Sequence, residues 1–326
     1  MRKSIVIALT VLGFALPAAG QGISAKDALA ELGFPADAEQ QVLAGALVKT
    51  TLKTTSDREL AAALAFLVKL PPAKLAEELQ GGLLLSIDPN SKHHGALEGE
   101  GSPAQLASLK LSPNQVNAHS NAKPGEDLNL SAAEIQAFQA LSGQPAARVE
   151  EQVRKGLIAR YAAYRAKGLD GIAPYERDGD KQTPAAGDLK RASEAASGLK
   201  KHAPAFFEVL NSYPKGKAQI NETFNWQNYE AHGEPVLLLT HAFTMSEGDA
   251  ILASQRQFYV SSSYNVEQAI AALLPVSEGT LVVYVNRTST NQVTGFGGGS
   301  KRAIGSRVLA SQLDDLFSKL QKTAPK

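Results

Sequence analysis

The sequence predicts an α+β fold in which an antiparallel sheet packs against a long C-terminal helix. Two observations point to it. After Pro235, three segments are rich in β-branched and aromatic residues, which is typical of consecutive antiparallel strands. From Ile304 to Leu320, apolar residues then recur at the spacing of an amphipathic helix. We expect one domain over residues 21–326, with a helical and loop-rich insertion at about residues 81–220.

The first twenty residues have the pattern of a secretory signal. Arg2 and Lys3 precede an apolar run from Ile5 to Leu16, and the small residues after it supply a cleavage site before Gln21. The run is about half of the roughly twenty residues that cross a bilayer as a helix, and no later segment is apolar over that length. We therefore expect a soluble periplasmic or secreted protein with no transmembrane segment after cleavage.

Composition excludes several classes of function. The chain has no cysteine, so disulfides, thiolate metal sites and cysteine nucleophiles are ruled out. Without Arg2 and Lys3, the 33 basic residues fall to 31 against 32 acidic ones, which leaves a net charge of −1. That balance argues against nucleic acid and against an anionic membrane as partners.

The N-terminal part of the domain is predicted to hold a β-hairpin and a short helix. Two apolar stretches, at residues 46–52 and 60–70, are separated by a polar, turn-like segment. The second stretch is rich in alanine and could instead be helical. Two prolines end it, and residues 73–80 then have the pattern of a short helix with proline near its first turn.

The middle of the chain is predicted to be loop and helix. Residues 81–130 hold many Gly, Pro, Ser, Asn and His residues, which indicates loop broken by short helical pieces. Ser131 followed by Glu134 is a capping-box pattern that opens another helix. Apolar residues then follow a helical repeat that ends near Gly168, namely Val149, Val153, Leu157, Tyr161 and Tyr164.

The late part of the chain supplies the predicted sheet and the closing helix. The strands are expected at Val236–Phe243, Ala250–Val260 and Thr280–Arg287, with a turn between the first two. The closing helix is expected to present one apolar face made of Ile304, Val308, Leu309, Leu313, Leu316, Phe317 and Leu320. This order of elements resembles the helix-grip architecture of the START and Bet v1-like superfamily. The resemblance implies a curved sheet around the last helix, with a hydrophobic ligand between the two.

A second resemblance concerns short segments. Residues 256–264, residues 283–287 and the Gly-rich residues 295–299 are similar to segments of an uncharacterised family of exported bacterial proteins. Residues 123–127 are similar to a Pro-Gly segment that relatives flank with cysteines, which this chain lacks. The resemblance implies the compartment and the fold, and it supplies no catalytic residues.

His241 is the first candidate for a binding residue. It lies in a predicted strand on the side of Leu237, Leu239 and Phe243, so it could be a hydrogen-bonded core histidine. The alternative is a polar group in an apolar pocket, where it would orient a ligand together with residues of neighbouring strands. Trp226, in an aromatic cluster, either lines that pocket or belongs to the core. The other predicted pocket residues are Arg256, Tyr259, Tyr284 and Asn286.

A Gly-rich segment between the last strand and the last helix is a weaker candidate. Gly297, Gly298, Ser300 and Lys301 could hold an anion at the helix N-terminus, or Ser300 could simply cap the helix. The segment fails the phosphate-loop and dinucleotide patterns. No metal site is expected, because the adjacent His93 and His94 cannot aim at one ion.

The leading interpretation is a non-enzymatic exported protein that binds a hydrophobic or amphipathic small molecule such as a lipid, with no cofactor. One alternative is an envelope structural or protein-interaction factor whose interior is filled by its own side chains. The other is an enzyme that uses His241 as an acid or base, which needs a partner that no motif identifies.

Overall fold

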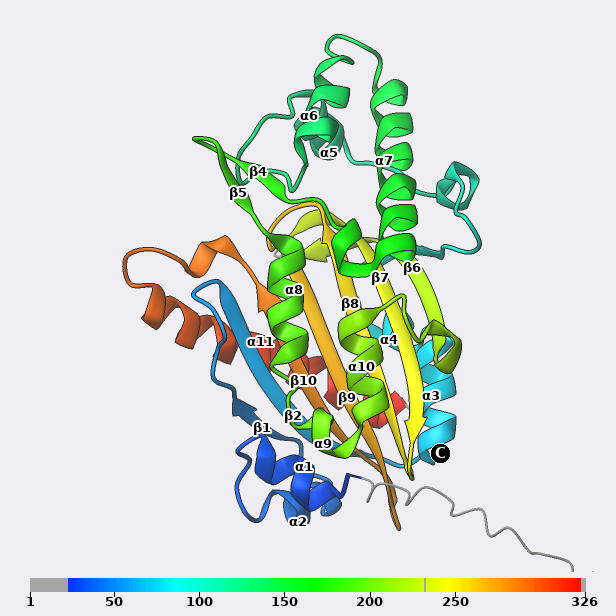
Figure 1. Ribbon diagram of the computed structural model, residues 1–326, viewed down its shortest axis with the longest axis vertical. Helices are drawn as coiled ribbons and strands as arrows, with labels where there is room; N and C mark the ends of the chain where they lie inside the picture. Colours follow the sequence, from blue (N-terminus) through cyan, green and yellow to red (C-terminus); the bar gives the residue numbers. More distant parts are fainter. Residues whose placement is uncertain (1–22, 232, 324–326) are drawn as a thin grey trace, which may run out of the picture.

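Figure 1 shows a computed structural model that describes residues 23–231 and 233–323. The predicted signal sequence lies outside these residues. The protein has an α+β fold, in which a large antiparallel sheet carries helices on both faces. The strands of this sheet are β1 (Val48–Thr51), β2 (Glu59–Val68), β3 (Ser91–Ala96), β6 (Asn221–Ala231), β7 (Glu234–Glu247), β8 (Ala250–Val260), β9 (Val266–Val276) and β10 (Gly279–Ser289).

The helices and a small second sheet complete the chain. A two-stranded ribbon is formed by β4 (Tyr175–Arg177) and β5 (Lys181–Thr183). The α-helices are α1 (Ala25–Glu31), α2 (Ala38–Leu43), α3 (Pro72–Gln80), α4 (Leu83–Ile87), α5 (Pro113–Ser120), α6 (Ala132–Gln139), α7 (Ala146–Lys167), α8 (Ala185–Glu194), α9 (Leu199–His202), α10 (Pro204–Ser212) and α11 (Gly298–Thr323). The 3₁₀ turns are η1 (Pro103–Leu106), η2 (Gly168–Gly171), η3 (Lys217–Gln219) and η4 (Asn291–Val293).

The eight strands of the large sheet are ordered β1-β2-β10-β9-β8-β7-β6-β3. Strands β6 to β10 form a meander, the hairpin of β1 and β2 adds to β10, and β3 adds to β6 at the other edge. The predicted N-terminal hairpin and the three predicted late strands are confirmed. Strands β3, β6 and β9 were not predicted. Polar residues fill most of β6, which is unusual for a strand, and β9 holds three alanines and a proline among its apolar residues.

The alternation of side chains along each strand gives the sheet two different faces. In β7, Leu239 and His241 point to the face that α1, α2, α7, α8 and α10 cover, which we call the α7 face. Thr240 and Ala242 point to the opposite face, which α3, α4 and α11 cover and which we call the α11 face. In Figure 1, α8 and α10 lie in front of the sheet, with α3, α4 and α11 behind it.

The helices above the sheet follow local sequence signals. The capping box predicted at Ser131 is confirmed, because the Ser131 hydroxyl accepts from the Glu134 backbone N–H and the Glu134 carboxylate accepts from the Ser131 backbone N–H. The predicted apolar face of α7 is buried at all five positions. Gly168 ends this helix at a φ of 59°, where an added Cβ would lie 1.8 Å from the carbonyl oxygen of Tyr213.

Helix α11 packs on the sheet, but not with the whole predicted face. Phe317 stacks on Phe66 of β2 with ring centroids 4.7 Å apart, and Leu313 and Leu320 are also buried. Ile304 and Val308 are 60% and 47% exposed, so the prediction was wrong for them. Each lies nine residues before a buried residue, Leu313 or Phe317, which is half a turn away at about 100° per residue.

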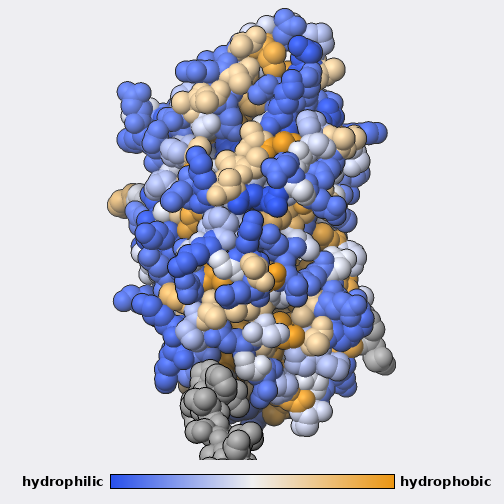
Figure 2. Space-filling model, turned by 45° about the vertical axis from the view of Figure 1, so that its right-hand side comes forward, coloured by the Kyte–Doolittle hydropathy of each residue, from blue (hydrophilic) through white to orange (hydrophobic). Residues whose placement is uncertain are grey.

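One side of the molecule shows no large apolar patch (Figure 2). Figure 2 brings the right-hand side of Figure 1 forward and shows mainly hydrophilic residues, with hydrophobic ones in small separate groups. Small groups of this kind are normal and need no ligand or partner to explain them. The candidate binding residues lie in the interior of the two faces, and the exposed large hydrophobic residues lie on the outer side of α11 and in the loop before it.

Candidate functional site

The structure divides the predicted pocket between the two faces of the sheet. His241, Arg256, Tyr259 and Trp226 lie on the α7 face. The other two residues, Tyr284 and Asn286, lie on the α11 face, because Tyr284 packs edge-on against Phe317 of α11 with ring centroids 4.6 Å apart. The six side chains therefore do not line one pocket. Strand order decided this outcome, since alternation within one strand gives no information about another strand.

A β-bulge at Phe258 brings Arg256 and Tyr259 to the same face. Arg256 lies directly opposite His241 of β7, and Tyr259 lies opposite Leu239. The extra residue between them shifts the register, so side chains three positions apart point the same way. Simple alternation along the strand would place these two side chains on opposite faces of the sheet, and the sequence gives no signal of the bulge.

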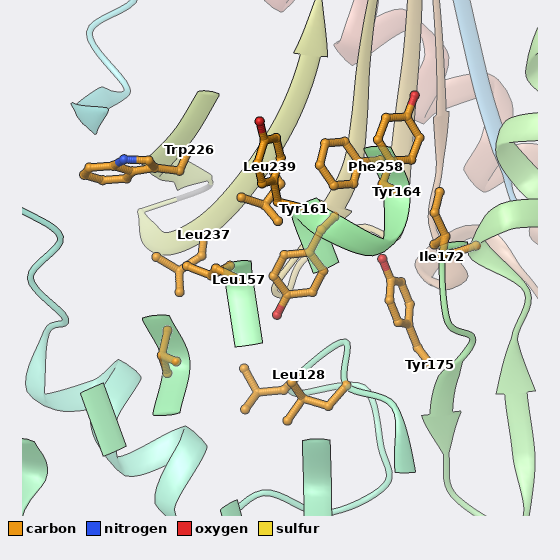
Figure 3. Packing of buried hydrophobic residues seen from close by; sticks show 14 of the residues in the cluster. Leu128, Leu157, Tyr161, Tyr164, Ile172, Tyr175, Trp226, Leu237, Leu239 and Phe258 are labelled. Atoms are coloured by element: carbon orange, nitrogen blue, oxygen red, sulfur yellow. The ribbon is translucent and has the colours of Figure 1, made fainter. Parts of the chain in front are cut away.

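Trp226 and Tyr259 are core residues of the α7 face, and Figure 3 shows Trp226 among its hydrophobic neighbours. The indole N–H of Trp226 donates to the carbonyl oxygen of Gln105 at 3.0 Å, and an added Cβ on Gly95 would lie 2.6 Å from that nitrogen. Tyr259 lies under the Arg160 guanidinium, 4.0 Å from its ring centroid. Both side chains are enclosed, so the core interpretation holds for Trp226.

His241 and Arg256 belong to a buried hydrogen-bond network centred on Tyr164. Arg256 donates from Nη1 to the Tyr164 hydroxyl at 3.0 Å, and that hydroxyl lies 3.0 Å from Nδ1 of His241. On its other side, Nε2 of His241 lies 3.0 Å from the carboxylate of Glu222. The remaining Arg256 nitrogens donate to Gln268, Ser193 and the carbonyl oxygen of Leu210.

The protonation states within this network follow from its contacts. Burial, with Arg256 nearby, lowers the pKa of His241 to about 4, so the ring is neutral near neutral pH. A neutral imidazole can accept a hydrogen bond from the Tyr164 hydroxyl at Nδ1 and donate one to Glu222 from Nε2. Each group in the chain then donates to the next: Arg256 to Tyr164, Tyr164 to His241, and His241 to Glu222. Burial opposes the charged form of Glu222, but the bond from His241 keeps its pKa below the ordinary value.

His241 has the partner that acid or base chemistry needs, but a substrate cannot reach it. The side chain is completely buried, and the Phe224 ring stacks on it at 4.3 Å. Tyr213 covers it at 4.5 Å between ring centroids. The arrangement satisfies buried polar groups and holds α7 and α10 on the sheet, which is a structural role.

The α11 face has an open apolar groove with a cavity volume of about 90 Å³. Four alanines on three neighbouring strands form much of its floor, namely Ala242, Ala253, Ala269 and Ala271, and the side chains of Thr244 and Gln255 lie between them. An alanine side chain ends at Cβ and does not reach the helices above it. The larger residues around the alanines contact those helices, so a space is left over the floor. These larger residues form the walls: Phe66, Leu75, Leu79, Leu84, Leu273, Val282, Tyr284, Phe317 and Leu320.

A row of polar side chains crosses the α11 face next to the groove. Five residues are paired in register across five strands, and we call them the polar row: Asn225, Thr240, Gln257, Glu267 and Thr288. Thr240 is 2% exposed, yet its hydroxyl has no hydrogen-bond partner among the described residues, and neither has the side-chain oxygen of Asn225. A buried polar atom without a partner is costly, so these two oxygens are candidates to bind a ligand group or water.

The other end of the polar row is internally bonded. Thr288 donates to Glu267 at 3.2 Å, and Asn286 donates to the Tyr284 hydroxyl at 3.2 Å. Burial raises the pKa of Glu267 above its ordinary value. Asn286 and Tyr284 connect the row to the groove, because Tyr284 is also one of the groove walls.

A second cavity of about 150 Å³ lies on the α7 face between α1, α8 and α9. Apolar residues of β9 and β10, including Ile270, Ala272 and Val283, form its floor. Its polar lining comes from Glu31 and Ser197 on the helix side and from Gln268 and Arg287 on the sheet. Gln268 is already bonded to Arg256, and Arg287 forms an ion pair with Glu59 at 2.8 Å, so both groups have partners.

The other polar clusters are neutralised or lack a ligand set. Asp188 of α8 forms ion pairs with Arg191 of the same helix and with Arg58, which precedes β2 and so connects α8 to the large sheet. At α11, the helix begins at Gly298, with Gly297 before it. Ser300 and Lys301 therefore lie in the first turn, and the expectation of Ser300 as a cap is wrong. Within the described chain, no group of three or more His, Asp or Glu side chains could hold a metal ion.

Comparison with protein-family models, curated proteins and solved structures finds no match to this chain. In the described residues, none of the helices combines the length and the apolar character that crossing a bilayer requires.

Sequence reasoning missed several members of both sites. Tyr164 was assigned only to the apolar face of α7, and Glu222 and Thr240 were not singled out. Glu222 precedes the aromatic residues of β6 at the two-residue spacing of a strand, which was the available signal. The unpartnered state of Thr240 depends on three strands and has no sequence signal.

Proposed function

We propose that this protein is an exported, non-enzymatic binding protein for a hydrophobic or amphipathic small molecule, such as a lipid, and that the ligand binds in the groove of the α11 face. The observation that supports this most is the alanine-rich apolar floor, one two-residue step along the strands from the polar row with its two unpartnered oxygens. Small-molecule sites combine an apolar lining with a few polar groups, and a groove of about 90 Å³ would hold part of such a ligand.

The position of the groove agrees with the helix-grip resemblance. In that architecture a C-terminal helix lies across an antiparallel sheet, and a hydrophobic ligand occupies the space between the two. Here Phe317 and Leu320 of the C-terminal helix form one wall, and the sheet forms the floor. A curved, START-like sheet and an exported protein remain proposals that rest on sequence.

The polar row indicates what head group the ligand carries. The free oxygen of Asn225 can only accept a hydrogen bond, and Thr240 can accept or donate. Glu267 lies in the same row and burial raises its pKa, so the row has no positive charge to offset a buried ligand carboxylate, whose desolvation would be costly. A hydroxyl or amide head group on an apolar chain fits these groups best.

The first experiment identifies what the protein carries. Native mass spectrometry of the protein purified from its own cell envelope, followed by organic extraction, should reveal a stoichiometric apolar adduct. A protein without adduct, whose melting temperature does not respond to a panel of lipids, would contradict the proposal and favour the structural or protein-interaction alternative.

The second experiment places the site with a probe. N-phenyl-1-naphthylamine, an uncharged fluorophore with one N–H donor, should bind, and 1-decanol should displace it better than decanoate does. Ala271→Phe should fill the groove and weaken probe binding by at least about 10-fold, because the probe would lose the apolar surface that it buries there, at about 25 cal/mol per Å². Ala272→Phe is the matched control. Ala272 is the next residue of β9, and its side chain points to the opposite face, where it lines the second cavity.

The two variants separate the two cavities. Loss of binding in Ala271→Phe alone supports the groove. Loss in Ala272→Phe alone would move the ligand to the α7 face and contradict the proposed site. Circular dichroism and melting curves should be measured for both variants, so that loss of binding can be separated from loss of folded structure.

A further inference from the structure

The outer side of α11 and the loop before it carry an exposed apolar surface. Phe296, Ile304 and Val308 are the large hydrophobic residues that the described chain leaves exposed, at 101%, 60% and 47%, and we call them the outer patch. Ile304 and Val308 are one helical turn apart, on the side of α11 that faces away from the sheet. One short segment therefore holds all three.

Phe296 is held away from the protein by the glycines around it. Gly295 and Gly297 have φ values of 74° and 72°, a backbone region that favours glycine, and the ring is fully exposed. Two further glycines follow at the start of α11. A large aromatic side chain at the tip of such a loop has no packing role in the folded protein.

The same segment is basic, although the whole chain is nearly neutral. Residues 295–313 contain Lys301, Arg302 and Arg307 and no acidic residue, and Asp314, which pairs with Lys49, and the exposed Asp315 follow directly. Lys301 and Arg307 are exposed, and neither forms an ion pair with any residue in the described ranges. Some exposed cations elsewhere are paired, such as Lys49 with Asp314, while others such as Lys200 and Lys201 have no ion pair among the described residues, so the basic character of this segment rests on its composition. The net charge of −1 expected for the mature chain hides this local excess.

We propose that the outer patch and its cations dock on the surface of an anionic lipid bilayer. Exposed aromatic and aliphatic side chains enter the boundary between head groups and acyl chains, while neighbouring Lys and Arg contact anionic head groups. A second copy of this chain is disfavoured as the occupant, because symmetric pairing of two patches would bring like cations together. The inference does not depend on ligand binding in the groove.

Vesicle sedimentation with the purified protein tests this surface. We expect binding to vesicles of equal parts dioleoylphosphatidylcholine and dioleoylphosphatidylglycerol, little binding to pure phosphatidylcholine, and a clear loss at high salt. Lys301→Gln with Arg307→Gln should weaken binding about 25-fold, on a scale of about 5-fold for each cation near the surface. Phe296→Ser with Ile304→Ser should weaken it by at least about 10-fold.

Two controls keep the result specific. Arg148→Gln with Lys155→Gln removes the same charge from an exposed face of α7 and should leave binding unchanged. The groove variant Ala271→Phe should also bind vesicles normally, so failure of the groove proposal does not affect this test. Equal loss in the α7 control, or no binding to anionic vesicles, would overturn the proposal. Analytical ultracentrifugation that shows a dimer abolished by Ile304→Ser would overturn it in favour of a second copy.

Discussion

The two faces of strands β7 and β8 use neighbouring residues in opposite ways. His241 points to the α7 face, where both ring nitrogens have partners and aromatic rings fill the space around them. Thr240, one residue earlier, points to the α11 face, where its hydroxyl is buried without a partner. The α7 face here is packed and satisfied, whereas the α11 face has small residues, space and unpartnered atoms.

This difference indicates where stability and binding reside. A region whose polar groups are all bonded can be altered only at a cost in folding, since any deletion leaves a buried group unpaired. A region with alanines under a groove tolerates change and can accept a ligand. The prominent polar residues of the sequence therefore mark the stable region, and the inconspicuous alanines mark the proposed site.

The largest effect is expected at Arg256. Arg256→Ala should lower the free energy of unfolding by about 3–5 kcal/mol, because four groups that accept from the guanidinium lose their donor inside the core. Gln255→Ala, its neighbour on the opposite face, should change it by less than about 0.5 kcal/mol. Urea denaturation followed by circular dichroism measures both, and similar losses would remove the contrast between the faces.

The pH dependence of stability should report His241. Its folded pKa of about 4 lies below the ordinary value of 6.5, so the unfolded chain binds more protons between these values. Stability should therefore fall as pH drops from about 6.5 to 4, by about 3 kcal/mol from this group. His241→Gln should flatten the slope of the unfolding free energy against pH, and His94→Gln at the sheet edge should leave it unchanged. An unchanged slope in His241→Gln would contradict the burial of a neutral ring.

Added volume should distinguish the two faces. Ala65→Leu inserts a larger side chain among the buried residues of the α7 face, where Ala65 has no exposed surface and does not line the second cavity, and should cost about 2 kcal/mol. Ala271→Leu extends into the groove and should cost less than about 0.5 kcal/mol, since the space is there to receive it. Melting temperatures rank the two, and the reverse order would mean that the groove is not open in solution.

The smallest effect tests the unpartnered hydroxyl. Thr240→Val removes an oxygen that has no partner, so it should stabilise the free protein by about 1 kcal/mol. Thr280→Val removes a buried hydroxyl that donates to the carbonyl oxygen of Leu70, and it should cost about 1 kcal/mol. If both variants lose stability, a bound water or ligand already satisfies Thr240.

Local elements were predictable because their signals span only a few residues. The capping box at Ser131 and the five buried residues of α7 depend on contacts three or four positions apart, which the sequence contains directly. The predicted core role of His241 on the side of Leu239 and Phe243 also follows from alternation within one strand. These predictions needed no knowledge of the fold.

The prediction of one pocket did not hold because it combined different strands. Whether Tyr284 lies on the same face of the sheet as His241 depends on strand order and register. The bulge at Phe258 changes which residues of β8 point to each face, and the sequence gives no sign of it. The apolar face assigned to α11 included Ile304 and Val308 for a similar reason. Hydrophobicity gives the period of a helix, but the partner that it meets decides which side is buried.

The sequence by itself determined the α+β composition, the antiparallel strands after Pro235 and the amphipathic closing helix, because periodicity of side chains is a local property. Only the tertiary structure decided which residues meet. Pairing among strands distant in sequence set the alanine floor of the groove, the unpartnered Thr240 and the separation of Tyr284 from His241. A contact across the sheet is fixed by register over the whole chain, and no short pattern contains that information.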